Sequence, residues 1–128
     1  MINKNDLKFL AEGYFDGQHM VNEKGKVFFV PENYASKSML VEGDKMRLYL
    51  TKENKEIFKQ VMPVDRRYGI AVIKAVKGGF AAEFEGRLYK ILTASAMFHN
   101  VKAEDRIRIC IPLRTISKWA ALSGTILN

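Results

Sequence analysis

The sequence predicts a mostly-β protein built from small β-barrel units, and three observations lead to that prediction. The segments 45–51 and 105–111 alternate basic and apolar residues with a period of two, as half-buried strands do. From residue 68 onward, β-branched and aromatic runs are separated by glycine-containing turns. The chain has 128 residues, 48% of them hydrophobic, which suffices for one compact domain or two very small ones packed together.

The region 1–25 is expected to hold a short N-terminal helix followed by turns. Residues 5–12 have Asn5 as an N-cap, and Gly13 follows as a residue that can end a helix. Two helical turns are not stable alone, so their apolar side chains would need a partner to bury against.

The first β-unit is expected to span residues 26–64 and to contain three strands. The expected elements are a strand at 26–30, one helical turn within 32–39, a strand at 45–51 and a return strand at 56–62. In the middle strand, alternation places Lys45, Arg47 and Tyr49 on the outer face. Three strands are too few to close a barrel, so this unit must complete the second unit or pack on its edge.

The second β-unit is expected to span residues 65–128, with the polar segment 65–67 as the boundary or hinge. The expected elements are strands at 68–76, 80–85 and 87–92, a short helix or ordered loop within 93–102, strands at 105–111 and 116–122, and a tail at 123–128. Three meandering strands, a crossing segment and a closing hairpin are the order of an OB-type barrel. The only tryptophan, Trp119, falls in the last expected strand.

A faint internal repeat relates the two units. Residues 25–48 can be laid on residues 86–108, and each copy has a strand, a short crossing segment, an acidic turn and a cationic strand. In the acidic turns, Asp44 and Asp105 are expected to accept hydrogen bonds from backbone N–H groups. The repeat also leaves a second architecture open, in which the two units interlock into a single cradle-loop barrel.

Two stretches of the chain resemble known RNA-binding modules. The segments GIAVIKAVKGGFAAEFEG (69–86) and EDRIRI (104–109) resemble the OB-type RNA-binding repeats of cold-shock and translation proteins, over about residues 68–122. Glu104, after Ala103, departs from the Gly-Asp that those repeats often have before the fourth strand. Residues 26–62 more faintly resemble the RNA-binding domain of the terminator Rho. The whole chain is also similar to small bacterial proteins without an assigned function, which implies no activity.

The charge of the chain favours a polyanionic partner. The net charge is +7 and the pI about 9.6. By segment, the balance of Lys and Arg against Asp and Glu is 3 − 4 = −1 for residues 1–25, 9 − 6 = +3 for 26–67 and 9 − 4 = +5 for 68–128. Because the surplus lies in the β-rich part, RNA or single-stranded DNA is the expected partner.

Nine residues are candidates for contacts to nucleic acid. They are Lys45, Arg47, Tyr49, Arg66, Arg67, Tyr68, Arg106, Arg108 and Lys118. Arg106 and Arg108 lie two residues apart on one strand face, about 7 Å, which is close to the spacing of successive phosphates. An aromatic side chain beside such cations suits a stacked base. By contrast, Phe28, Phe29, Phe80 and Phe84 are expected to lie in the core.

Two other functions are kept as alternatives. A protein-interaction module or accessory subunit would use a soft apolar patch formed by Met20, Met39, Met62, Met97 and Phe98, and the protein could also be a homo-oligomer. A double-stranded DNA binder would require an interlocked dimer.

Catalysis and cofactor binding are not expected from this sequence. It has no phosphate-binding loop and no nucleophile elbow. It has two histidines, His19 and His99, far apart, and a single cysteine, Cys110, which cannot form an internal disulfide. No apolar segment has the length of a membrane span or the pattern of a signal peptide, so we expect a cytoplasmic protein. Because no cofactor-binding motif is present, we expect no cofactor.

Overall fold

The computed structural model describes residues 6–127 and contains two five-stranded antiparallel sheets and two short helices, which confirms the mostly-β prediction. The first sheet is formed by β1 (Lys8–Phe15), β2 (His19–Val21), β3 (Val27–Phe29), β4 (Lys45–Leu50) and β5 (Glu56–Met62). The second is formed by β6 (Arg66–Val76), β7 (Gly79–Phe84), β8 (Arg87–Lys90), β9 (Arg106–Pro112) and β10 (Ala121–Ile126). Helix α1 (Glu32–Lys37) precedes β4, and α2 (Thr93–Phe98) precedes β9.

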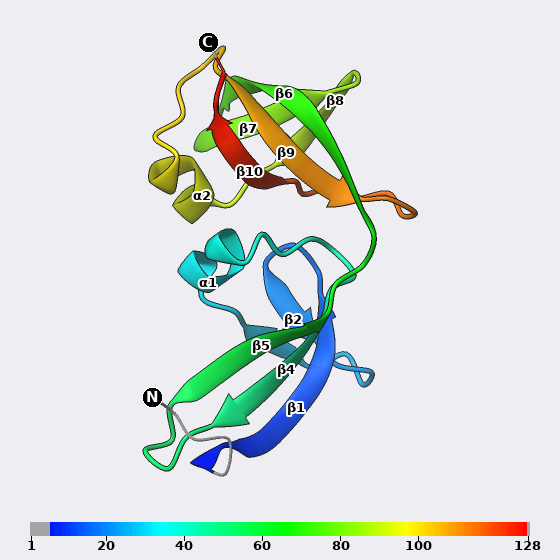
Figure 1. Cartoon of the computed structure of the whole chain (residues 1–128), viewed down its shortest axis with the longest axis vertical. Helices are drawn as coiled ribbons and strands as arrows, with labels where there is room; N and C mark the ends of the chain where they lie inside the picture. Colours follow the sequence, from blue (N-terminus) through cyan, green and yellow to red (C-terminus); the bar gives the residue numbers. More distant parts are fainter. Residues whose placement is uncertain (1–5, 128) are drawn as a thin grey trace.

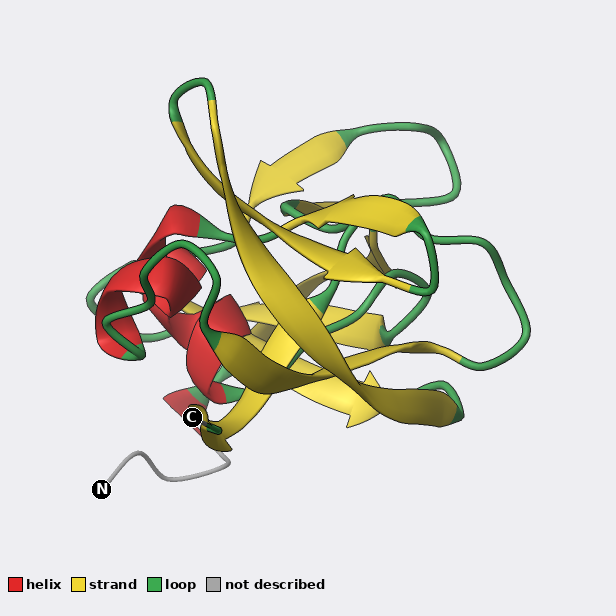
Figure 2. Cartoon of the chain, turned by 90° about the horizontal axis from the view of Figure 1, so that it is seen from above, coloured by secondary structure: helices red, strands yellow, loops and turns green. Residues whose placement is uncertain are grey.

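The two halves have the same topology. The strand order is β3-β2-β1-β4-β5 in one sheet and β10-β9-β6-β7-β8 in the other, so β1 corresponds to β6 and β4 to β9. Figure 1 shows the two halves stacked along the long axis, with α1 and α2 facing each other between them. Figure 2 shows that both helices lie on the same side of the strands.

Neither sheet is closed into a barrel in the described part of the chain. In each sheet the two edge strands pair with one neighbour only, and every strand pair joins strands of the same half. The single interlocked barrel is therefore not the arrangement of residues 6–127.

The expected helix at residues 5–12 is wrong from Lys8 onward, because this stretch belongs to β1. As a strand, the segment pairs with β4 along most of its length and with β2 at its end, so both neighbours supply hydrogen bonds and burial that an isolated two-turn helix lacks. Asn5, the expected N-cap, lies outside the described residues. With β1 and β2 added, the first half has five strands rather than three, and it needs no strand from the second half.

The C-terminal strand is also placed differently from the prediction. β10 covers Ala121–Ile126, so most of the expected tail is strand, while residues 113–118 form a turn region. Trp119 lies before β10, forms an isolated bridge with Lys90, and packs against the core of the first half. A Cβ at Gly17 would overlap its indole ring, so this glycine admits the tryptophan.

The acidic turns before β4 and β9 have matching hydrogen bonds, which confirms the interpretation of the repeat at this point. Val41 N donates to Asp44 Oδ2 (2.9 Å), and Lys102 N donates to Asp105 Oδ2 (2.7 Å). The residue before each aspartate has a positive φ, +97° at Gly43 and +73° at Glu104. Glu104 thus occupies a left-handed position that favours glycine.

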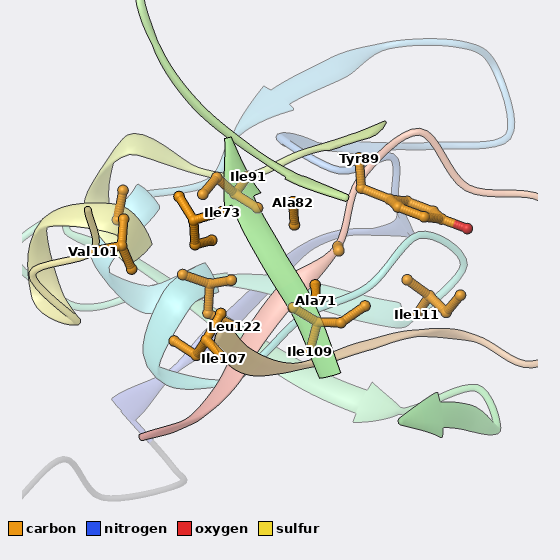
Figure 3. Packing of buried hydrophobic residues seen from close by; sticks show 12 residues of the cluster. Ala71, Ile73, Ala82, Tyr89, Ile91, Val101, Ile107, Ile109, Ile111 and Leu122 are labelled. Atoms are coloured by element: carbon orange, nitrogen blue, oxygen red, sulfur yellow. The ribbon is translucent and has the colours of Figure 1, made fainter. Parts of the chain in front are cut away.

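The two halves each have a core, and they also share contacts. Figure 3 shows the second core, where side chains of β6 and β9 such as Ile73 and Ile109 converge. The first core includes Leu92 from the second half. Between the helices, Ser95 Oγ donates to Ser36 Oγ at 2.8 Å.

The buried carboxylate of Asp44 contacts both halves and the linker between them, residues 63–65. Asp44 is fully buried, and Arg66 at the start of β6 pairs with it at 2.5 Å (Nη2 to Oδ2) and 2.9 Å (Nη1 to Oδ1). Val64 N and the Gln60 side-chain amide donate to the same carboxylate at 2.9 and 3.0 Å. The carboxylate therefore holds a turn of the first sheet, the linker and the first strand of the second sheet together.

Candidate nucleic-acid interface

On the outer face of the first sheet, a carboxylate neutralises the predicted cations. Lys45 and Arg47 project outward from β4, and Glu12 of β1 lies between them. Lys45 Nζ is 3.1 Å from Glu12 Oε1, and Arg47 Nε donates to Glu12 Oε2 at 2.7 Å. The hydrogen bond from Arg47, with that from Lys45, lowers the pKa of the Glu12 carboxyl group. Glu12 is therefore ionised at neutral pH and competes with a phosphate for both cations.

On the outer face of the second sheet, the equivalent cations have no such partner in the described part of the chain. The matching turns align Lys45 with Arg106 and Arg47 with Arg108, and both arginines are exposed. Arg108 lies opposite Ile70 of β6, at the register position that Glu12 holds against Arg47. Within residues 6–127 neither arginine forms an ion pair. The second sheet therefore presents two guanidinium groups to solvent.

An exposed aromatic residue completes the same surface. Tyr68 is 57% exposed and lies opposite Cys110 of β9. It is two residues before Ile70 in β6, so both side chains point to the same side of the sheet. We call the outward residues Tyr68, Ile70, Arg106 and Arg108 the second-sheet basic face. Cys110 points to the same side but is fully buried, and burial raises the pKa of its thiol.

The first sheet has a matching aromatic position that the sequence interpretation missed. Phe9 is 54% exposed and lies opposite Tyr49, as Tyr68 lies opposite Cys110. Its ring meets that of Tyr49 edge-on, with centroids 6.0 Å apart, and Lys59 Nζ lies 5.6 Å from the Tyr49 centroid. Because the sequence predicts a helix at residues 5–12, it does not predict the alignment of Phe9 with Tyr68.

Among the phenylalanines expected in the core, Phe28, Phe80 and Phe84 pack against the two cores, but Phe29 does not. Phe29 is 79% exposed on β3 and meets the imidazole of His19 edge-on at 5.3 Å. Strand alternation explains the difference, because Phe28 faces inward and its neighbour must face outward.

Three of the nine predicted residues add no free cation to the two outer faces. The Arg66 side chain is only 13% exposed because it pairs with Asp44, so we assign it a structural role. Arg67 pairs with Glu85 and lies 5.1 Å from the centroid of Phe84. Lys118 is exposed in the turn before β10, and its backbone N–H donates to Glu42 Oε1 at 3.1 Å.

The predicted apolar patch forms in part, since Met39, Met62, Met97 and Phe98 are exposed and Met39 and Phe98 line the same hollow. Met20 is fully buried in the first core, whereas Met97 and Phe98 on α2 are well exposed. No helix in residues 6–127 is long and apolar enough to cross a membrane. The same residues contain no group of three or more His, Cys, Asp or Glu side chains that could hold a metal ion.

Comparisons with known proteins give no match for this chain among family models, curated proteins or solved structures. The assignment of a function therefore depends on the geometry of the two outer faces.

Proposed function

We propose that this protein binds single-stranded nucleic acid, RNA or DNA, through the second-sheet basic face. The observation that carries the proposal is that, among residues 6–127, Arg106 and Arg108 have no acidic partner at the place where the first sheet has Glu12. An arginine pair left exposed on a strand face must be hydrated or occupied by an anion.

The geometry suits a phosphodiester backbone with a stacked base. Residues i and i+2 of a strand are about 7 Å apart, so Arg106 and Arg108 can each contact one of two successive phosphates. Tyr68 lies near Arg108 across β6 and β9 and offers an exposed ring on which one base can stack. Cation–phosphate contacts and stacking carry little sequence information, so we infer low sequence specificity.

We further propose that each half is an OB-type unit. Three meandering strands, a short helix and two further strands occur twice, and in both sheets the first strand of the unit pairs with its second and fourth strands. This order supports the OB-type interpretation, in which strand faces bind oligonucleotides.

Fluorescence anisotropy with three labelled probes tests the function. The probes are a 12-nucleotide uridine RNA, the corresponding thymidine DNA and a 12-base-pair duplex. We expect both single strands to bind, more weakly as salt increases from 50 to 200 mM, and the duplex to bind less tightly. Tighter binding of the duplex would contradict the proposal in favour of a double-strand binder, and no binding at 50 mM salt would reject nucleic acid altogether.

A protein-interaction module is the second candidate, and one observation favours it. Met97 is 75% exposed on α2, next to the exposed ring of Phe98. Adjacent large apolar side chains on a surface are typical of contact sites for other proteins. A stable partner or oligomer that forms without nucleic acid, together with no binding of the single-stranded probes, would support this candidate.

A further inference from the structure

A groove lies along the free edge of β1 in the first half. β1 pairs with β2 only at Tyr14 and Phe15, so within residues 6–127 the segment 9–13 has no strand partner on that side. The space left there has a volume of about 550 Å³, within the usual range for small-molecule sites. Its walls are β1 on one side and the β2–β3 turn with Phe28 on the other.

The second half shows that the fold does not require this groove. β6 is likewise without a β7 partner before Val72, but the ring of Phe84 fills the corresponding place. A Cβ at Gly69 would overlap that ring, and Arg67 covers the ring and pairs with Glu85. The register of β1 and β6 aligns Gly69 with Ala11, which lines the open groove. One copy of the unit therefore closes this space with its own side chains and the other leaves it open.

The lining of the groove combines aromatic, cationic, backbone and acidic groups. Phe9, Tyr14 and Phe28 offer aromatic surface, and Lys24 and Lys26 lie at the β2–β3 turn. The backbone of residues 9–13 that faces away from β4 offers N–H and carbonyl groups. The lining also includes two carboxylates.

These two carboxylates are Glu12, already paired with Lys45 and Arg47, and Glu23. With Glu12 neutralised by its own partners, Lys24 and Lys26 outnumber Glu23 at the groove. The remaining charge favours an anion.

We propose that this groove holds one nucleotide of a bound strand, with the base against the aromatic side chains and the edge of β1, and the phosphate at Lys24 and Lys26. The inference rests on the proposed function, because the groove would bind a base of the same strand whose phosphates contact Arg106 and Arg108. A base has both an aromatic face and an edge of donors and acceptors, so it matches the lining better than a purely apolar ligand does.

Backbone amide NMR with uridine 5′-monophosphate tests the groove apart from the strand. We expect shifts that saturate at residues 9–13 and 24–28 in the wild-type protein. The K24A/K26A variant should lose these shifts and should bind the 12-nucleotide RNA about tenfold more weakly. The matched control is K52A/K55A in the β4–β5 turn, which removes the same charge from the same half and should change RNA binding less than twofold.

The outcomes separate the groove from the function. If the RNA binds the wild-type protein but uridine monophosphate shifts none of these amides, and K24A/K26A binds RNA as K52A/K55A does, the groove proposal is overturned and the function stands. Shifts with the mononucleotide but no RNA binding would reject the function and keep the groove. Shifts caused instead by a pentapeptide of alternating threonine and valine, with none from the mononucleotide, would overturn the groove proposal in favour of strand addition to β1.

Discussion

Replacing Ile70 with glutamate is expected to weaken binding of the single-stranded probe by about ten- to a hundredfold, because the new carboxylate would neutralise two phosphate-binding cations. The first sheet shows the physical reason, since Glu12 holds both Lys45 and Arg47 from the same register position. Ile70 is 40% exposed, so a polar side chain can stand there with little loss of buried surface. Anisotropy at constant salt measures the effect.

Two controls separate local pairing from the loss of net charge. The I70Q variant has a side chain of the same size as I70E but without its charge. We expect it to bind the single-stranded probe within about threefold of the wild-type protein. I116E makes the same isoleucine-to-glutamate change at an exposed position in the turn before β10. If I116E weakens binding as much as I70E does, the effect is a general one of charge and the second-sheet basic face is not the site.

The second large effect concerns stability. Replacing Asp44 with alanine should lower the free energy of unfolding by about 3–5 kcal/mol, because it leaves the mostly buried Arg66 guanidinium without its counter-charge. It also leaves the N–H groups of Val41 and Val64 without their acceptor. Urea unfolding followed by the fluorescence of Trp119 measures the loss.

An exposed aspartate–arginine pair provides the matched control for this prediction. The side chains of Asp65 and Arg114 lie 3.3 Å apart, and both are more than two-thirds exposed. D65A should cost less than about 1 kcal/mol, as exposed ion pairs do. If D44A does not fold well enough to measure, D44N, which keeps the size and one acceptor, gives the comparison. If the substitution at Asp44 lowers the free energy of unfolding no more than D65A does, the buried Asp44–Arg66 pair does not stabilise the contact between the two halves.

The sequence predicts strand positions best where buried and exposed side chains alternate along the strand. In β4 and β9 the side chains of Met46, Leu48, Ile107, Ile109 and Ile111 are buried and the arginines face outward, so the strand positions and the two basic faces follow from a period of two. Leu50, at the end of β4, is only half-buried. The acidic turns were also predictable, because aspartate in a tight turn commonly bonds backbone N–H groups. Neither inference needed contacts between distant parts of the chain.

What could not be predicted depended on such contacts. β1 contains Leu10, Ala11 and Glu12, which are acceptable in a helix, and only pairing with β4 and β2 makes it a strand. The neutralisation of Arg47 by Glu12 follows from that pairing, as does the alignment of Phe9 with Tyr68. The charge of Arg66 predicts a phosphate contact, but its burial against Asp44 depends on a residue 22 positions away in the sequence. Charge and pattern alone do not distinguish a paired cation from an exposed one.

We expect Arg106 and Arg108 each to contact one phosphate of a bound single strand. The most direct test is the slope of the logarithm of the binding constant against the logarithm of salt concentration, for the wild-type protein and for R106A/R108A. Each phosphate contact to a single strand contributes about 0.7 to the magnitude of this slope, so we predict a decrease of about 1.4 in the variant, with weaker binding at every salt concentration. An unchanged slope and affinity in a folded R106A/R108A protein would contradict the account.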